Sequence, residues 1–110
     1  MIESLYGKYI REREGKRIIE DEFGFATYIF INNECYIENV YVVEKMRQKG
    51  VASGYLDEIS EIAKRNGCKA ITTTCRPSAN ESTDSLKAIL GYGFKLTAAF
   101  QDAIIFAKEL

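Results

Sequence analysis

Three cationic side chains and a glycine come just before a predicted helix, and this spacing suits an anion. Lys45, Arg47 and Lys49 lead to Gly50, and no acidic residue occurs between Lys45 and Leu56. The first turn of the helix therefore lacks the Asp or Glu that usually complements its dipole. Free N–H groups, a positive dipole end and nearby cations form an anion site, most simply for phosphate. On this stretch alone, a helix start that is cationic for purely structural reasons is an equal alternative.

The absence of histidine restricts the chemistry that the chain can perform. There is no His among the 110 residues, and Cys35, Cys68 and Cys75 show no Cys-x-x-Cys spacing. His-based metal sites, Ser-His triads and imidazole acid–base catalysis are thereby excluded. The three thiols indicate neither a disulfide framework nor a zinc site, so we expect buried free cysteines and no metal. A proton-transfer step would have to use a carboxylate, a tyrosine, a cysteine or ordered water.

Composition indicates one ordinary globular domain over residues 1–110. The sequence is 46% hydrophobic and 28% charged, and its net charge of −1 gives no basic field that would attract nucleic acid. No apolar run is long enough to cross a bilayer, and the first residues lack a secretory pattern. We therefore expect a cytoplasmic protein without nucleic-acid or membrane partners. Its small size favours a homodimer, with the last strands as the interface.

The helix that follows the cationic turn is the clearest predicted element. Its apolar residues recur on one face over residues 51–65. A β-branched and aromatic run over 35–43 predicts the strand before it, and 69–75 predicts the strand after it. Because a helix separates these two strands, we expect them to run parallel in a right-handed crossover.

The remaining pattern completes an α/β (α+β) fold. We expect a single-domain mixed β-sheet with helices on both faces and a short N-terminal region. The first residues predict a short helix over 2–10, with a strand over 9–14 as the alternative. Further strands are predicted over 17–20, 23–31, 94–100 and 103–108, and a short helix is predicted from Ser82 or Thr83 to about Gly91. Strands 23–31 and 35–43 should pair antiparallel across a short turn.

The hexapeptide Arg47-Gln48-Lys49-Gly50-Val51-Ala52 resembles the Arg/Gln-x-x-Gly-x-Gly/Ala acyl-CoA signature of the GNAT (GCN5-related N-acetyltransferase) superfamily. The preceding run Tyr36-Ile37-Glu38-Asn39-Val40-Tyr41-Val42 is similar to the family's central strand. Residues 82–94, which end in Gly93-Phe94, are similar to its second motif. The resemblance covers about residues 16–110, and the order of elements carries as much of it as the hexapeptide.

This resemblance implies an acetyl-CoA-dependent N-acetyltransferase that works by direct attack. A primary amine of a small molecule or a protein would attack the thioester and receive the acetyl group. Acetyl-CoA would be the cosubstrate, with its pyrophosphate on the helix start and its pantetheine arm along the splayed central strand. A catalytically inactive acyl-CoA-binding regulatory module is the alternative. The CoA-binding residues implied are Val40, Tyr41, Val42, Arg47, Gln48, Lys49, Gly50, Val51 and Ala52, with Asn80, Ser82 and Ser85 as further candidates.

Glu38 is the general-base candidate, because attack on a thioester carbonyl requires a neutral amine. Its structural alternative is a strand glutamate that faces solvent or pairs with a lysine. The family's second motif often carries a tyrosine that protonates the departing thiolate, but Ile89 occupies that position in this sequence. Tyr92 could act in its place, or could merely pack beside Gly93. Helix capping would explain Ser82 as well as CoA contact does.

Overall fold

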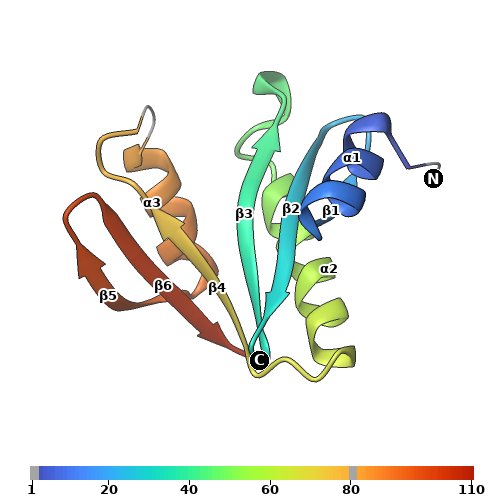
Figure 1. The fold of residues 1–110 in the computed structure, drawn as a ribbon. Helices are drawn as coiled ribbons and strands as arrows, with labels where there is room; N and C mark the ends of the chain where they lie inside the picture. The colour runs from blue at the N-terminus through green and yellow to red at the C-terminus, as the bar shows by residue number, and fades with distance from the viewer. Residues whose placement is uncertain (1–2, 80–81) are drawn as a thin grey trace.

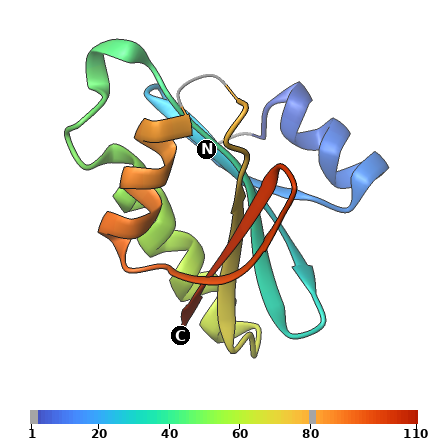
Figure 2. The same cartoon turned by 90° about the vertical axis from the view of Figure 1, so that its left-hand side faces the viewer.

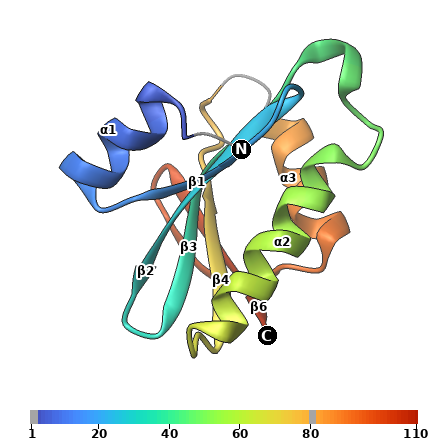
Figure 3. The same cartoon turned by 90° about the vertical axis from the view of Figure 1, so that its right-hand side faces the viewer.

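The computed structural model describes residues 3–79 and 82–110, and for Ser82 only the backbone. A six-stranded mixed sheet has the order β1-β2-β3-β4-β6-β5 (Figure 1). The elements are α1 (Leu5–Glu14), β1 (Arg17–Glu20), β2 (Gly24–Ile31), β3 (Glu34–Val42), the 3-10 turn η1 (Glu44–Met46), α2 (Val51–Arg65), β4 (Ala70–Cys75), α3 (Ser82–Tyr92), β5 (Lys95–Phe100) and β6 (Ala103–Glu109). Helix α1 covers one face of the sheet, and α2 and α3 cover the other (Figure 3). The predicted α/β fold with helices on both faces is confirmed.

The β3–α2–β4 unit is the parallel crossover that the sequence predicts. Residues 34–37 of β3 pair in parallel with residues 70–73 of β4. Between these strands, α2 buries Tyr55, Ile59 and Ala63 against the sheet. A fully buried isoleucine such as Ile59 stabilises the fold by about 1.5–3 kcal/mol through its transfer from water.

The β2–β3 hairpin turns at Asn32 and Asn33, whose φ angles of 50° and 66° are both positive. Two left-handed residues match the right-handed twist of the flanking strands, and asparagine tolerates this conformation well. The two strands pair antiparallel from Ile31↔Glu34 onward, as predicted. The last two strands also form an antiparallel hairpin, but β6 rather than β5 lies next to β4 (Figure 2).

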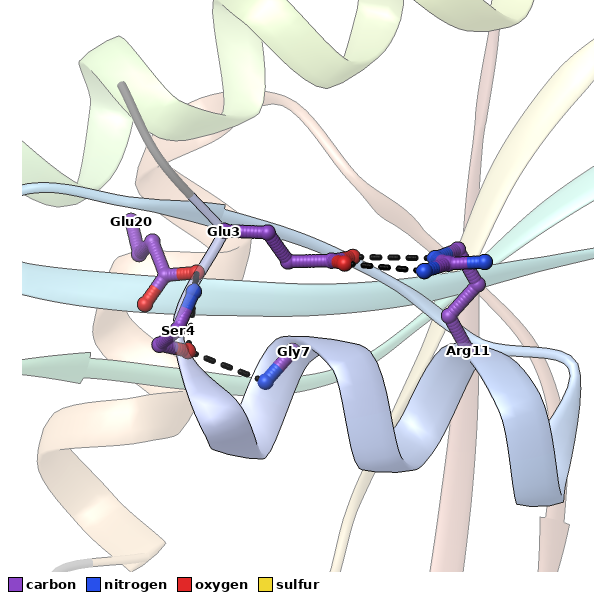
Figure 4. Close-up of polar contacts among 5 residues, drawn as sticks. All are labelled: Glu3, Ser4, Gly7, Arg11 and Glu20. Atoms are coloured by element: carbon purple, nitrogen blue, oxygen red, sulfur yellow. Dashed lines mark hydrogen bonds and ion pairs between the residues drawn. The ribbon is translucent and has the colours of Figure 1, made fainter.

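Helix α1 extends to Glu14, so the predicted end at residue 10 is too early and the alternative strand over 9–14 is wrong. The helix is held by contacts that lie far apart in the sequence. Ser4 caps it by accepting the Gly7 N–H at 2.9 Å, and its hydroxyl donates to Glu20 of β1 at 3.0 Å (Figure 4). Glu3, just before the helix, forms a bidentate pair with Arg11 of α1 at 3.0 Å (Figure 4).

Helix α1 leads directly into β1, the edge strand that pairs with β2. Gly15 ends the helix in the left-handed conformation, and the Lys16 N–H donates to the Ile10 carbonyl at 3.1 Å. From there the Lys16 side chain reaches Glu38 of β3. Within the described residues, no helix combines the length and the apolar character required to cross a membrane.

Candidate functional site

Strands β3 and β4 form a fork, which is the structural basis of the candidate site. Their pairing ends at Ile37↔Thr73, although β3 continues to Val42 and β4 to Cys75. Beyond that point β4 pairs with β6 alone as far as Cys75↔Ile104, and the ribbons of β3 and β4 diverge (Figure 1). The fork therefore opens at the carboxyl ends of the two parallel strands, where α/β proteins commonly bind their ligands.

A β-bulge lies where the fork begins, and Glu38 is its extra residue. Thr27 of β2 pairs with Asn39, whereas Tyr28 pairs with Ile37, so Glu38 has no partner of its own in this ladder. The buried hydroxyl of Thr27 accepts the Asn39 N–H at 3.1 Å and so satisfies a group that the bulge displaces. Bulges bend a strand and redirect its side chains. This bulge turns β3 away from β4.

The backbone of β3 beyond the bulge faces the fork at alternate residues. The N–H groups of Asn39 and Val43 point toward β2, where they donate to Thr27 and Phe23. Because these directions alternate along a strand, the backbone groups of Val40 and Val42 point into the fork. Tyr41, between them, has its backbone toward β2.

The ring of Tyr41 lies on the sheet face covered by α1. It is 5.8 Å from the ring of Phe25, which in turn is 5.9 Å from the ring of Tyr6 in α1. The side chain of Tyr41 is thus part of an aromatic row next to the fork, and 47% of the residue remains exposed.

The cationic turn connects the open end of β3 to the start of α2. Gln48 has a φ of 62°, and Gly50, the residue before the helix, has a φ of 84°. Among the described residues, no side chain caps α2, and the first turn contains no acidic residue. The first N–H groups of a helix lack intrahelical acceptors, so those of α2 face outward. A Cβ built on Gly50 meets no atom of the described residues within 4 Å, so the helix start is open to a ligand.

Arg47 links this turn to the strand. Its Nε donates to the Val42 carbonyl at 2.9 Å, and its guanidinium lies 5.8 Å from the centroid of the Tyr41 ring. The side chains of Gln48 and Lys49 are exposed. The implied CoA-binding residues from Val40 to Ala52 therefore lie on the end of β3, the cationic turn and the start of α2, with Val42 itself buried.

Glu38 carries an ion pair on the sheet face covered by α1. Lys16 Nζ lies 2.7 Å from Oε2 and 2.9 Å from Oε1 of Glu38, and the Asn39 amide donates to Oε1 at 3.1 Å. Hydrogen bonds to Glu38 and then to Glu14 raise the pKa of Lys16. The lysine pairing considered as the structural alternative for Glu38 is therefore present, and it occurs at the base of the fork.

Tyr92 lies elsewhere. Its hydroxyl donates to Asp57 of α2 at 2.6 Å, and Lys108 Nζ is 4.2 Å from its ring centroid. Burial, and after it the bond to Asp57, raises the pKa of Tyr92. Lys108 pairs with Ile71, two residues before the last β3–β4 pair, so Tyr92 lies beside the closed end of the sheet. The structure does not bring Tyr92 to Glu38.

The second-motif candidates are only partly described. Ser85 is exposed on α3, and Ile89 packs against the hydrophobic core. Asn80 and the side chain of Ser82 lie outside the described part of the chain. The backbone of Ser82 is described and begins α3.

The three cysteines are buried and free, as expected. Burial raises the pKa of Cys35 to about 12 and also raises the pKa of Cys68. A thiol held protonated is a poor nucleophile, so a cysteine mechanism has no support at these two positions. The described residues contain no group of three or more potential metal-ligating side chains.

Sequence reasoning missed three residues that shape the fork. Thr27 completes the bulge, and the Thr73 hydroxyl donates to the Ile37 carbonyl at 3.0 Å at the last paired position. Lys16 contacts Glu38 across 22 residues of sequence. Threonines inside strands were a weak signal for the first two, and nothing in the local pattern marks Lys16.

A cavity of about 520 Å³ lies apart from the fork. It lies along the edge strand β1. Strands β2 and β3 lie between β1 and β4 in the sheet. Its lining consists of Glu3, Ile18, Ile19, Glu20, Asp21, Tyr28, Glu58 and Ile62.

Comparisons with known proteins agree with this geometry. The model of the acetyltransferase (GNAT) family matches residues 5–92. The structure is similar to a PaiA N-acetyltransferase from Thermoplasma acidophilum in complex with coenzyme A (TM-score 0.79, 17% identity, 96% of this chain and 69% of that chain). It is also similar to an acetyltransferase from Bacillus cereus (TM-score 0.66, 22% identity, 86% of this chain and 71% of that chain). A third similar structure is the anti-CRISPR protein AcrVA5 (TM-score 0.71, 19% identity, 84% of this chain and 97% of that chain). No curated protein matches the sequence. Because the family model spans most of the sequence, the chain belongs to the acetyltransferase (GNAT) family of N-acetyltransferases.

Proposed function

We propose that the chain uses acetyl-CoA to acetylate a primary amine of a small molecule or a protein by direct attack. The observation that carries this proposal is the fork between β3 and β4, which opens at the same end as the uncapped start of α2. A strand edge and a helix N-terminus side by side suit a ligand that has both an amide-containing arm and a pyrophosphate. Acetyl-CoA has both. The similar PaiA structure is a complex with coenzyme A, which also supports this ligand.

In this arrangement the pyrophosphate lies on the N–H groups of residues 48–52. The positive end of the α2 dipole and the exposed Lys49 favour an anion there, and Gly50 leaves the approach open. The pantetheine amides pair with the backbone of Val40 and with the N–H of Val42, which point into the fork, while the Val42 carbonyl accepts from Arg47. Strand N–H groups also polarise the thioester carbonyl and stabilise the oxyanion that forms on attack.

Glu38 is the group that we assign to proton transfer. An acceptor amine arrives as an ammonium ion, and it must lose a proton to Glu38 or to an intervening water before it can attack. The C–N bond then forms, the nitrogen loses its second proton to solvent, the C–S bond breaks, and the CoA thiolate takes up a proton from solvent. We assign Tyr92 to packing between α2 and α3, because its hydroxyl is committed to Asp57.

We also propose a homodimer formed through β5. Leu96 and Phe100 on this edge strand are 60% and 68% exposed, which is unusual for large apolar side chains on a strand with an unpaired edge. Light scattering should then report twice the mass of the chain for the wild type and the mass of a single chain for Phe100→Glu.

Two measurements on the same variants test the proposed function. We expect saturable calorimetric binding of CoA, and release of free thiol when acetyl-CoA and an amine acceptor are supplied. Glu38→Gln should keep its CoA affinity and lower thiol release by about 100-fold or more. Glu34→Gln, at the closed end of the same strand, is the matched control and should retain its rate. Equal rates for both variants would remove Glu38 from the mechanism, and CoA binding without thiol release would identify an acyl-CoA-binding module instead.

A further inference from the structure

Lys16 contacts the carboxylate that the proposed function assigns to proton transfer. Its ammonium group lies 2.7 Å from the Glu38 carboxylate, the group assigned to deprotonate the acceptor. Glu38 is the bulge residue at the point where β3 leaves β4, so the contact lies at the base of the fork. In the proposed function the thioester lies beside this bulge, so Lys16 would present a primary amine to the general base as an acceptor does.

The position of Lys16 is fixed by the fold and does not depend on this ion pair alone. The residue follows the left-handed Gly15, and its N–H bonds to the Ile10 carbonyl. Only 22% of its side chain is exposed, and Glu14 provides a second carboxylate at 3.1 Å. By contrast, Lys64 is 53% exposed and lies 3.6 Å from Glu61 of its own helix, remote from the fork.

We propose that Lys16 is a self-acetylation site, modified within its own chain by the acetyl-CoA bound in the fork. This inference rests on the proposed function and adds a protein substrate to it. Glu38 takes one proton from the Lys16 ammonium, and the neutral Nζ attacks the thioester carbonyl carbon. The C–N bond forms, the C–S bond breaks, and the nitrogen loses a second proton. The CoA thiolate takes up one proton, so the products are Nζ-acetyl-lysine, CoA and one proton in solution.

Acetylation would alter the site itself. An acetylated Lys16 has no charge, so its ion pairs with Glu38 and Glu14 are lost. Because only the neutral amine attacks, and the pKa of Lys16 is raised by these carboxylates, the rate of modification should increase with pH across the neutral and mildly alkaline range.

Peptide mass spectrometry with deuterium-labelled acetyl-CoA tests the proposal, because the label separates new acetyl groups from those acquired during expression. We expect label on Lys16 at a rate constant that does not change over about a tenfold range of protein concentration. Label on Lys64 should stay at the chemical background, and Glu38→Gln should lower the Lys16 rate by about 100-fold or more. Without added amine, thiol release should stop after about one equivalent. Lys16→Arg should abolish this release, and Lys64→Arg should leave it unchanged.

The outcomes separate this inference from the proposed function. Thiol release with an added amine while Lys16 remains unlabelled would overturn the self-acetylation alone. Equal labelling of Lys16 and Lys64, or labelling that Glu38→Gln does not slow, would also overturn it, because the reaction would then be chemical. Absence of CoA binding would overturn both proposals.

Discussion

Gly50→Glu tests the proposed pyrophosphate site in a way that separates binding from folding. At Gly50, φ is +84° and a new Cβ meets no described atom within 4 Å, so the substitution introduces no clash. The left-handed backbone still disfavours a residue with a side chain by about 1–2 kcal/mol. That cost affects the free energy of unfolding and not the shape of the site.

The effect on CoA binding follows from Coulomb's law. A carboxylate at residue 50 would lie about 5 Å from a phosphate held on the first N–H groups of α2. One pair of unit charges at that distance repels by about 1 kcal/mol in water and about 3 kcal/mol at an effective dielectric constant near 20. The affinity for CoA should therefore fall by about 5-fold to about 200-fold, and by more if both phosphates contribute.

Gly67→Glu is the matched control. Gly67 has a φ of +78° and no described atom within 4 Å of a built Cβ, so the variant carries the same backbone cost and the same charge. It follows the other end of α2, which spans 15 residues and thus about 22 Å. Salt screens a charge at that distance almost completely. Calorimetric titration of both variants with CoA should show the loss in Gly50→Glu alone; equal affinities would refute the assignment of the phosphate site.

Two further predictions concern the supports of the site. Thr27→Val should lower the free energy of unfolding by about 1–2 kcal/mol, because the Asn39 N–H in the bulge loses its acceptor, and Thr27→Ser should recover most of it in urea titrations. The hydrogen bond from Tyr55 is the largest cause of the lowered pKa of Asp21. A carboxylate with a lowered pKa stabilises the fold above its unfolded pKa of about 4, and this stabilisation is lost as the pH falls. Tyr55→Phe should therefore show a smaller decrease in Tm than the wild type on acidification from about pH 5; an identical decrease would contradict this origin.

The strongest local patterns predicted their elements well. The bounds of α2 and β1 agree with the prediction to the residue, and most other strands differ by one residue at an end. The apolar stripe of α2 needs only its own sequence to be recognised. The end of α1 was missed because its last residues are charged and show no buried stripe. A tertiary contact from Ser4 to Glu20 holds the helix in place, and no local pattern encodes such a contact.

For the candidate site, too, the sequence predicts the parts formed by consecutive residues and misses those formed by tertiary contacts. The cationic turn lies between β3 and α2 because consecutive residues form it, and the sequence alone located it. The bulge at Glu38 depends on the register between β2 and β3, which is fixed by pairing across a hairpin. The contact with Lys16 depends in addition on where α1 ends. Tyr92 was considered for its proximity to Gly93 in sequence, whereas the packing of α3 on α2 directs its hydroxyl to Asp57.

A crystal structure of the protein with acetyl-CoA is the most direct test of the central claim. The account predicts the pyrophosphate on the backbone N–H groups of residues 48–52, the pantetheine amides on the backbone of Val40 and Val42, and the thioester beside the bulge at Glu38. Acetyl-CoA bound outside the fork, or with its pyrophosphate away from the start of α2, would contradict it.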